Sequence, residues 1–206
     1  MSSIISATLA RAARGLPAAA LLLACVPAHA QSHYTIDPRF GSITFTVADF
    51  GLFTSRGRFD RFDADLEIDP AHLERTQIAV DVAAGSVDMP WQDATAMLRS
   101  PDFFDVGHHP HIRFTSTGVV PLGTDTYAVH GRLEIRGVTR PMSLTARLID
   151  RKPDPASGAE SADFMVSGNL NRSDFGMVAD PMVISDKVSI SIHARIRLAA
   201  ETAHGG

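Results

Sequence analysis

Apolar and polar residues alternate most regularly near the C-terminus, in the stretch KVSISIHARIRL at 187–198. Every second residue there is apolar, and the residues between are Lys, Ser, His or Arg. A period of two turns one face of a β-strand toward the core and the other toward water. A helix would spread the same residues around its axis. The stretch therefore predicts a half-buried strand.

The same alternation recurs along the rest of the chain, with turn-forming residues between its occurrences. Proline, glycine and aspartate cluster at 37–41, 68–72, 121–125 and 151–158, where they favour turns. Strands at short intervals joined by such turns indicate an antiparallel meander. The further predicted strands are 42–47, 57–69, 76–82, 111–117, 126–135, 141–148 and 163–170.

One segment has the character of a helix. Trp91–Ser100 contains neither glycine nor proline and lies between Pro90 and Pro101. Prolines are expected at the ends of a helix because they cannot continue one. No stretch has the composition of a domain linker, so the pattern indicates a single domain with one short helix.

About eight strands, each apolar on one side, must bury that side. Two sheets can pack face to face, or one sheet can close into a barrel. The apolar faces mix large residues such as Phe45 with small ones such as Gly131, which fits either a tightly packed or a hollow interior. An eight-stranded barrel is just wide enough to hold one small ligand. The pattern alone leaves these alternatives open.

Residues 1–30 have the features of an export signal. Arg11 and Arg14 precede the short apolar run Leu16–Val26, and small residues follow at 28–30, so we predict cleavage after Ala30 and export to the periplasm. The stretch LLAC, which ends at Cys25, is similar to a lipoprotein box. Lipid anchoring at Cys25 is the less favoured alternative, because a leucine fits poorly two positions before that cysteine.

Cysteine content and charge exclude several functions for the exported chain. Cys25 is the only cysteine, so cleavage would leave no thiol for a disulfide, a nucleophile or a thiolate metal site. Loss of Arg11 and Arg14 would lower the formal charge from -4 to -6. An acidic protein has no general attraction to phosphate backbones, which excludes nucleic acid as the expected partner.

Four stretches of the chain, taken with the final strand, are similar to one known family. They are Phe45–Asp69, Leu98–Thr117, Gly131–Leu144 and Leu170–Met177. Their order and spacing resemble the YceI-like family of exported lipid-binding proteins. The resemblance implies an all-β fold over residues 31–200, an eight-stranded antiparallel lipocalin-like barrel with one short helix. The stretch ETAHGG at 201–206 is expected to be a flexible tail.

The resemblance also implies a function. Members of the family bind a long isoprenoid, quinone or fatty-acid-like lipid inside the barrel, have no generally accepted catalytic residue, and are compatible with a homodimer. We therefore expect a lipid-binding protein without a cofactor rather than an enzyme. Relatives often carry a histidine where this chain has Asp49. The negative charge of Asp49 favours a neutral, quinone-like head group over a diphosphate.

Alternation and the resemblance together give the residues expected to line the lipid site. These are Phe45, Val47, Phe59, Phe114, Leu133, Leu144, Phe164, Ile190 and Ile192. One interpretation of Arg99, Arg172 and Asp174 is a polar cluster that grips a head group at the mouth of the barrel. The favoured interpretation of these three residues is a structural ion pair that fastens the helix to the sheet.

The stretch FFDVGHHPHIRF at 103–114 carries three histidines. His109 and His111 flank Pro110, which favours extended backbone, so these two could face one side while His108 faces the other. A metal site needs imidazoles that converge on one ion. We expect a solvated turn before the next strand instead, and no metal.

The sequence leaves two other classes of function open. An isomerase or hydrolase would need a titratable pair inside the lumen, and the sequence has no GxSxG, HExxH or P-loop motif that would supply a familiar active site. An interaction module that docks on a membrane redox protein would have a barrel filled by its own side chains and an exposed apolar patch.

Overall fold

The computed structural model describes residues 32–36, 40–49, 53–69, 72–153, 158 and 160–198. The predicted signal at 1–30, with Cys25, and the predicted tail at 201–206 lie outside the described residues. Within the described part of the chain, β-strands account for most residues and α1, Gln92–Arg99, is the one α-helix. The 3-10 turns are η1 (Leu73–Arg75), η2 (Ala84–Ser86) and η3 (Arg172–Phe175).

The strands follow the alternating stretches of the sequence closely. They are β1 (Ser32–Ile36), β2 (Ser42–Asp49), β3 (Phe53–Phe59), β4 (Phe62–Ile68), β5 (Gln77–Ala83), β6 (Val87–Asp88), β7 (His111–Pro121), β8 (Thr126–Ile135), β9 (Val138–Pro153), β10 (Glu160–Asn171) and β11 (Ile184–Leu198). The helix lies within the range that the flanking prolines predicted. Strands β1 and β6 were missed, and the stretch 57–69, predicted as one strand, is divided between β3 and β4. β9 continues through Arg151–Pro153, where the sequence predicted a turn.

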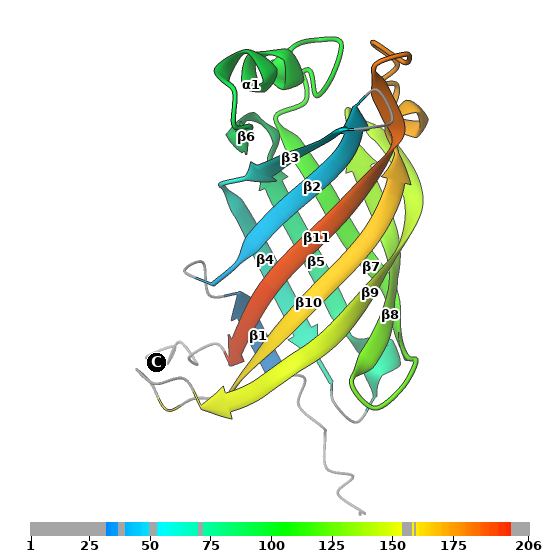
Figure 1. The fold of residues 1–206 in the computed structure, drawn as a ribbon. Helices are drawn as coiled ribbons and strands as arrows, with labels where there is room; N and C mark the ends of the chain where they lie inside the picture. The colour runs from blue at the N-terminus through cyan, green and yellow to red at the C-terminus, as the bar shows by residue number, and fades with distance from the viewer. Residues whose placement is uncertain are drawn as a thin grey trace, which may run out of the picture.

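These strand segments form one closed antiparallel barrel of eight strands (Figure 1). β1 and β2 act as one barrel strand, because both pair with β11. β3 and β4 form the second barrel strand: β3 pairs with β2, and β4 pairs with β1. β6 and β5 form the third, since β6 pairs with β3 and β5 pairs with β4. β7 to β11 follow in order, and the pairing of Tyr34 with Leu198 closes the ring. The prediction of an eight-stranded antiparallel barrel with one short helix is confirmed.

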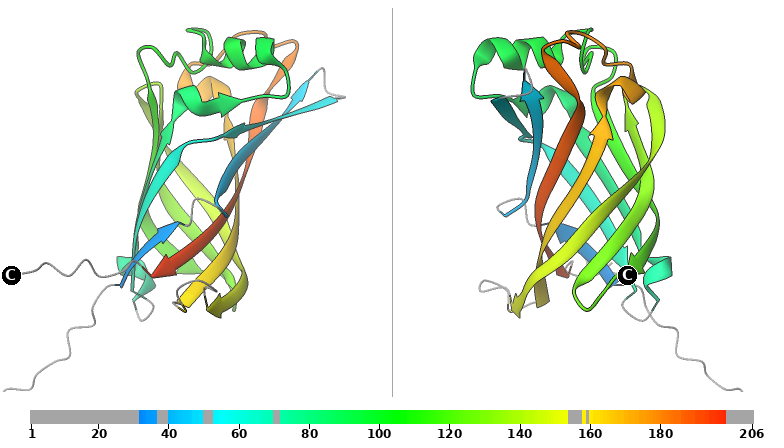
Figure 2. Two further views of the ribbon diagram at one scale, coloured as in Figure 1. Left: turned by 90° about the vertical axis from the view of Figure 1, so that its left-hand side faces the viewer. Right: turned by 45° about the vertical axis from the view of Figure 1, so that its right-hand side comes forward.

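The two ends of the barrel differ (Figures 1 and 2). One end carries α1, β6, η3 and the segment 176–183 that leads into β11; we call it the helix end. The other end carries η1 and the turn between β7 and β8, and we call it the turn end. The strands run obliquely between these ends, so a column of inward-facing residues connects them.

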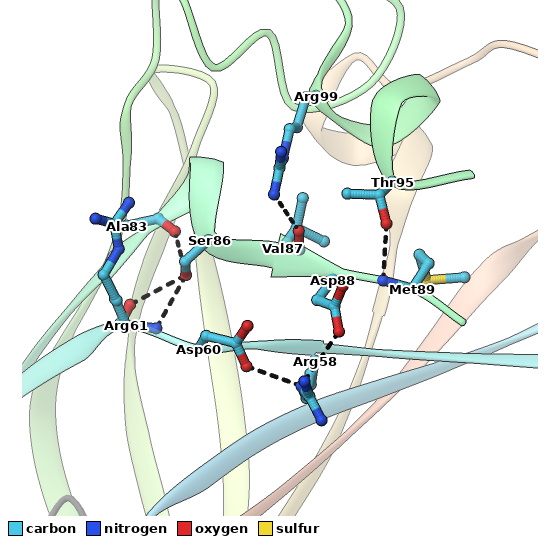
Figure 3. A network of polar contacts seen from close by, with 10 residues as sticks. All are labelled: Arg58, Asp60, Arg61, Ala83, Ser86, Val87, Asp88, Met89, Thr95 and Arg99. Atoms are coloured by element: carbon cyan, nitrogen blue, oxygen red, sulfur yellow. Dashed lines mark hydrogen bonds and ion pairs between the residues drawn. The ribbon is translucent and has the colours of Figure 1, made fainter. Parts of the chain in front are cut away.

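A set of polar contacts fastens α1 and β6 to the barrel at the helix end (Figure 3). The guanidinium of Arg58 on β3 binds Asp60 and Asp88 at 2.8 and 3.0 Å. The main-chain N–H of Met89 donates to the Thr95 hydroxyl at 2.9 Å, which ties the start of α1 to the segment before it. These bonds hold the α1 segment against β3 and so position one side of the barrel opening.

Small inward-facing residues make room for large neighbours inside the barrel. A Cβ added at Gly131 would lie 2.4 Å from Cζ of Phe114 and 2.6 Å from the carbonyl oxygen of Thr115. A Cβ added at Gly168 would lie 2.6 Å from Cδ2 of Leu144. Both distances are far below van der Waals contact, so these glycines are steric requirements of the wall packing.

We expect Gly131→Ala to destabilise the fold by about 1–3 kcal/mol, because the new methyl group overlaps both the Phe114 ring and backbone that cannot move away. Urea unfolding measures the loss. Gly118→Ala is the matched control on the neighbouring strand β7, where an added Cβ meets no atom within 4 Å. Equal tolerance of the two substitutions would show that Gly131 is not closely packed.

Candidate ligand cavity

The centre of the barrel is hollow. A cavity of about 1030 Å³ runs through it, at the upper end of the size of ligand pockets, about 300–1,000 Å³. Its wall is mainly aliphatic and aromatic and is built from the inward faces of strands all around the barrel. Large side chains have therefore not filled the interior, although Phe114 and Leu144 pack tightly over glycines.

Strand register explains how apolar side chains reach this wall from distant parts of the sequence. Phe45 of β2 is paired with Ile190 of β11, and Phe114 of β7 is paired with Leu133 of β8. Paired residues in a sheet point to the same face, so each such pair brings two apolar side chains into the lumen. The ring centroids of Phe45 and Phe59 lie 5.6 Å apart, and they add an aromatic contact to this wall.

Charged groups on the cavity wall lie at the two ends of the barrel. Asp49, Arg172 and Asp180 line it at the helix end, and Arg151 and Glu160 line it at the turn end. The Ser55 hydroxyl donates a hydrogen bond to the Asp49 carboxylate. The wall between these ends is apolar, so it offers hydrocarbon contact and few hydrogen bonds along its length.

Tyr34 on β1 lines the cavity near the charged residues of the turn end. Burial of the phenol raises the pKa of Tyr34 above its ordinary value; the negative charge of Glu160 raises it further and Arg151 opposes this. Burial disfavours the charged phenolate, so Tyr34 is a neutral hydroxyl donor at physiological pH. The sequence missed this residue together with strand β1.

Residues 34–196 match the family model described as a YceI-like domain. The chain belongs to the YceI-like family. A UPF0312 protein of Azotobacter vinelandii is 33% identical over 161 residues, covering 77% of this chain and 83% of the relative. A UPF0312 protein of Vibrio cholerae is 32% identical over 162 residues, covering 78% of this chain and 84% of the relative.

Solved structures show the same fold. BcnA of Burkholderia cenocepacia matches this YceI-like barrel with a TM-score of 0.69 at 21% identity, over 78% of this chain and 98% of BcnA. A polyisoprenoid binding domain from Saccharophagus degradans matches with a TM-score of 0.59 at 16% identity, over 81% of this chain and 98% of that domain. At these identities the likeness is one of fold.

All nine apolar residues predicted from the sequence lie on the wall of the YceI-like cavity. They are Phe45, Val47, Phe59, Phe114, Leu133, Leu144, Phe164, Ile190 and Ile192. The sequence missed the contribution of the segment 89–104, which brings Met97, Leu98 and Phe104 to the wall. The spacing of Ala94, Met97 and Leu98 on one face of α1 is the signal that could have found two of them.

The three predicted mouth residues are not joined into one cluster by their contacts. Arg99 donates to the carbonyl oxygen of Val87 at 2.9 Å. Arg172 is buried and lines the cavity, but its guanidinium donates to the carbonyl oxygens of Met177, Ile184 and Ser185. Asp174 is exposed and borders a separate, smaller pocket. Arg172 thus fastens η3 to Met177 and to the first residues of β11, and Arg99 fastens α1 to β6.

His108 and His109 lie in and after a series of turns, as the sequence predicted, and His111 is the first residue of β7. Nδ1 of His108 lies 2.9 Å from Oδ1 of Asp105, and Nδ1 of His111 lies 2.6 Å from Oδ1 of Asp81. The hydrogen bond with His108 lowers the pKa of Asp105. Among the described residues, no group of three or more His, Cys, Asp or Glu is placed to hold a metal ion.

Within the part of the chain that the structure describes, no helix combines the length and the apolar character that crossing a bilayer requires.

Proposed function

We propose that this YceI-like barrel binds one long apolar lipid, an isoprenoid, quinone or fatty-acid-like chain, and carries it in the periplasm. The observation that carries the proposal is the cavity of about 1030 Å³ with a wall that is apolar between its charged ends. Such a wall makes van der Waals contact with a hydrocarbon tail but offers few hydrogen-bond partners to a polar molecule. The nine apolar residues predicted from the sequence are the proposed contacts of that tail.

Desolvation supplies the binding energy in this proposal. Each buried methylene contributes roughly 0.8 kcal/mol, so one five-carbon isoprene unit contributes about 3–4 kcal/mol before costs. Ordering a flexible chain and losing its translational freedom reduce this substantially. The number of carbons inside the barrel therefore decides affinity more than any single polar contact.

The charged residues at the helix end of the cavity determine which head group fits there. Asp49 lies on the wall at the helix end and accepts a hydrogen bond from Ser55, whereas Arg172 is engaged with three carbonyl oxygens. A phosphate head group at this end would meet a carboxylate and a guanidinium that already has partners. We therefore propose a neutral head group, such as a quinone ring, in preference to a diphosphate.

Two observations support the lipid and the compartment. The structural neighbour from Saccharophagus degradans is a polyisoprenoid binding domain. The first thirty residues of this chain have an export signal's sequence, and the remainder contains no cysteine, which suits the oxidising periplasm. Export after cleavage at Ala30, with no lipid anchor at Cys25, is the localisation that we propose.

Mass spectrometry of lipids extracted from protein purified from its native host tests the proposal. We expect one class of long-chain lipid in roughly equal molar amount to the protein, chemically unchanged. Native mass spectrometry of the same sample should show the matching mass difference. A protein free of lipid in both measurements, or one that retains polar metabolites instead, would contradict the proposal.

The two competing functions predict different outcomes of the same extraction. An isomerase or hydrolase in the lumen would return an altered lipid, and its catalytic pair would have to come from the charged residues at the cavity ends. A docking module with a filled barrel would return none. The open cavity favours lipid binding over the filled barrel.

A further inference from the structure

Large apolar side chains are exposed to solvent around the helix end of the barrel. Phe53 is 68% exposed, Trp91 62%, Val178 65% and Met182 90%, and Met97 of α1 is 37% exposed. We call these five residues the apolar rim. They come from three separate segments: the start of β3, the stretch that begins and forms α1, and the loop between η3 and β11.

Strand register places the three segments around the same opening. Asp49 at the end of β2 is paired with Phe53 on one side and with Ile184 on the other, so Phe53 and the residues just before Ile184 share one end of the sheet. The α1 segment lies over the same end, opposite the loop at 176–183 (Figures 1 and 2). The apolar rim therefore surrounds the helix end rather than one side of the barrel.

The apolar rim is continuous with the cavity. Met97 belongs to both, because it lines the cavity and is exposed to solvent. Met182 directly precedes the wall residues Val183 and Ile184, and Trp91 lies two residues after the wall residue Met89. A hydrocarbon tail could move between an apolar phase against the rim and the cavity without crossing water.

The charges of these segments define the surface that they fit. The stretches 53–55, 89–98 and 176–184 contain Asp93 and Asp180 and neither lysine nor arginine, although Arg56 and Arg99 directly follow the first two. The guanidinium of Arg99 donates to the carbonyl oxygen of Val87, and Arg136 at the same end donates to the carbonyl oxygen of Phe103. Adjacent Asp49 is also acidic. Proteins that dock on anionic membranes present an excess of lysine and arginine around the apolar contact, and this rim has no such excess. Tryptophan, phenylalanine and methionine among balanced charges suit an apolar phase covered by neutral head groups.

We propose that the apolar rim docks onto a bilayer of zwitterionic phospholipid, with the cavity opening toward the membrane. Trp91, Phe53 and Met182 enter the interface between head groups and acyl chains, where their transfer from water is favourable. Lipid exchange with the cavity is the purpose that we assign to this contact, and that purpose rests on the proposed function. The docking itself is testable without it.

Trp91 is the only tryptophan of the chain, so its fluorescence reports on the rim directly. We expect the emission of the full-length protein to shift to the blue when phosphatidylcholine vesicles are added, and to be quenched when the vesicles contain phosphatidylcholine with brominated acyl chains. Contact of any other part of the chain with the vesicles leaves this signal unchanged. An emission spectrum that vesicles do not alter would overturn the proposal.

Two rim substitutions and one control test which surface makes the contact. Phe53→Ser and Met182→Ser should each weaken vesicle binding by about tenfold, since each removes one large apolar side chain from the contact. Leu122→Ser is the control: Leu122 is 62% exposed, as Trp91 is, but lies in the turn between β7 and β8 at the turn end. An equal loss in the control would overturn the assignment to the rim.

Other occupants of the rim give different results. A blue shift that grows with protein concentration in the absence of vesicles would indicate a second copy of the chain and contradict the proposal. Binding that requires phosphatidylglycerol and disappears with salt would contradict the neutral surface. Neither Phe53 nor Met182 lines the cavity, so their variants should retain bound lipid. Lipid absent from the wild type as well would refute the proposed function and leave the docking result standing.

Discussion

With tryptophan in place of Val166, we expect the purified protein to remain folded and to lose its lipid. Val166 lies on β10, between Ala146 of β9 and Ile192 of β11, and its side chain lines the cavity. An indole at this point projects into the hollow centre and occupies volume that a hydrocarbon tail would otherwise fill. Displacement of about four methylene groups costs about 3 kcal/mol, roughly a hundredfold in Kd.

Ligand content by native mass spectrometry and thermal unfolding together measure the effect of Val166→Trp. Ser167→Trp is the matched control, because Ser167 is the next residue of β10 and faces solvent. The control should keep its lipid, and both variants should keep their β-sheet signal in circular dichroism. A Val166→Trp protein that still carries the full amount of lipid would show that the tail does not pass this level of the barrel.

Asp163→Ala should be among the most destabilising single substitutions on the outer face of the barrel. Asp163 is 7% exposed and accepts two hydrogen bonds from Arg195, at 2.6 and 2.8 Å. Arg195 also lies over the Phe40 ring, 3.9 Å from its centroid. Removing the carboxylate takes both of these hydrogen bonds away from a partly buried guanidinium, which we expect to cost about 3 kcal/mol of the free energy of unfolding.

Urea unfolding of Asp163→Ala and of Glu134→Ala separates a buried ion pair from an exposed one. Glu134 pairs with Arg113 at 3.7 Å, and both side chains are more than a third exposed. Solvent screens an exposed pair, so the control should unfold almost as the wild type does. Equal, small effects of the two substitutions would contradict the structural importance of the Asp163–Arg195 pair.

The same pair has a defined dependence on pH. The hydrogen bonds from Arg195 hold the pKa of Asp163 below its ordinary value of 3.8. The unfolded state therefore takes up a proton first as the solution is acidified, and the stabilisation by this pair is lost as the pH falls through the lower, folded-state pKa. The stability difference between wild type and Asp163→Ala should be constant above about pH 5 and shrink below pH 4.

Alternation predicted most of the barrel because each strand has one wet and one dry face. β11 and β2 keep this pattern from the pairing of Val188 with Val47 to that of His193 with Ser42. β1 was not predicted because its sequence, SHYTI, is only five residues long. Its position depends on the pairing with β11 that closes the barrel, and a local sequence pattern carries no information about that pairing. The extension of β9 through Pro153 is likewise a result of pairing with β10, which overrides the turn preference of the residues there.

The candidate site, like the barrel, was predicted only in part. Inward-facing positions such as Phe45 and Ile190 follow from the period of two, but the pattern could not decide whether their side chains fill the centre. Gly131 and Gly168 absorb the bulk of Phe114 and Leu144 at the wall, and the space left depends on the diameter of the closed ring. Sequence motifs do not reveal that Arg172 and Arg99 donate to carbonyl oxygens of the main chain, so the polar cluster at the mouth stays a prediction.

The most direct measurement is a crystal structure of the protein purified from its native host without delipidation. The account predicts continuous, tubular electron density along the barrel axis, in contact with Phe45, Val166 and Ile190. Density that extends past Asp49 would identify the end at which the head group lies. A cavity that has collapsed onto its own side chains, or one that holds only ordered water, would contradict the claim that the barrel is a container for a lipid tail.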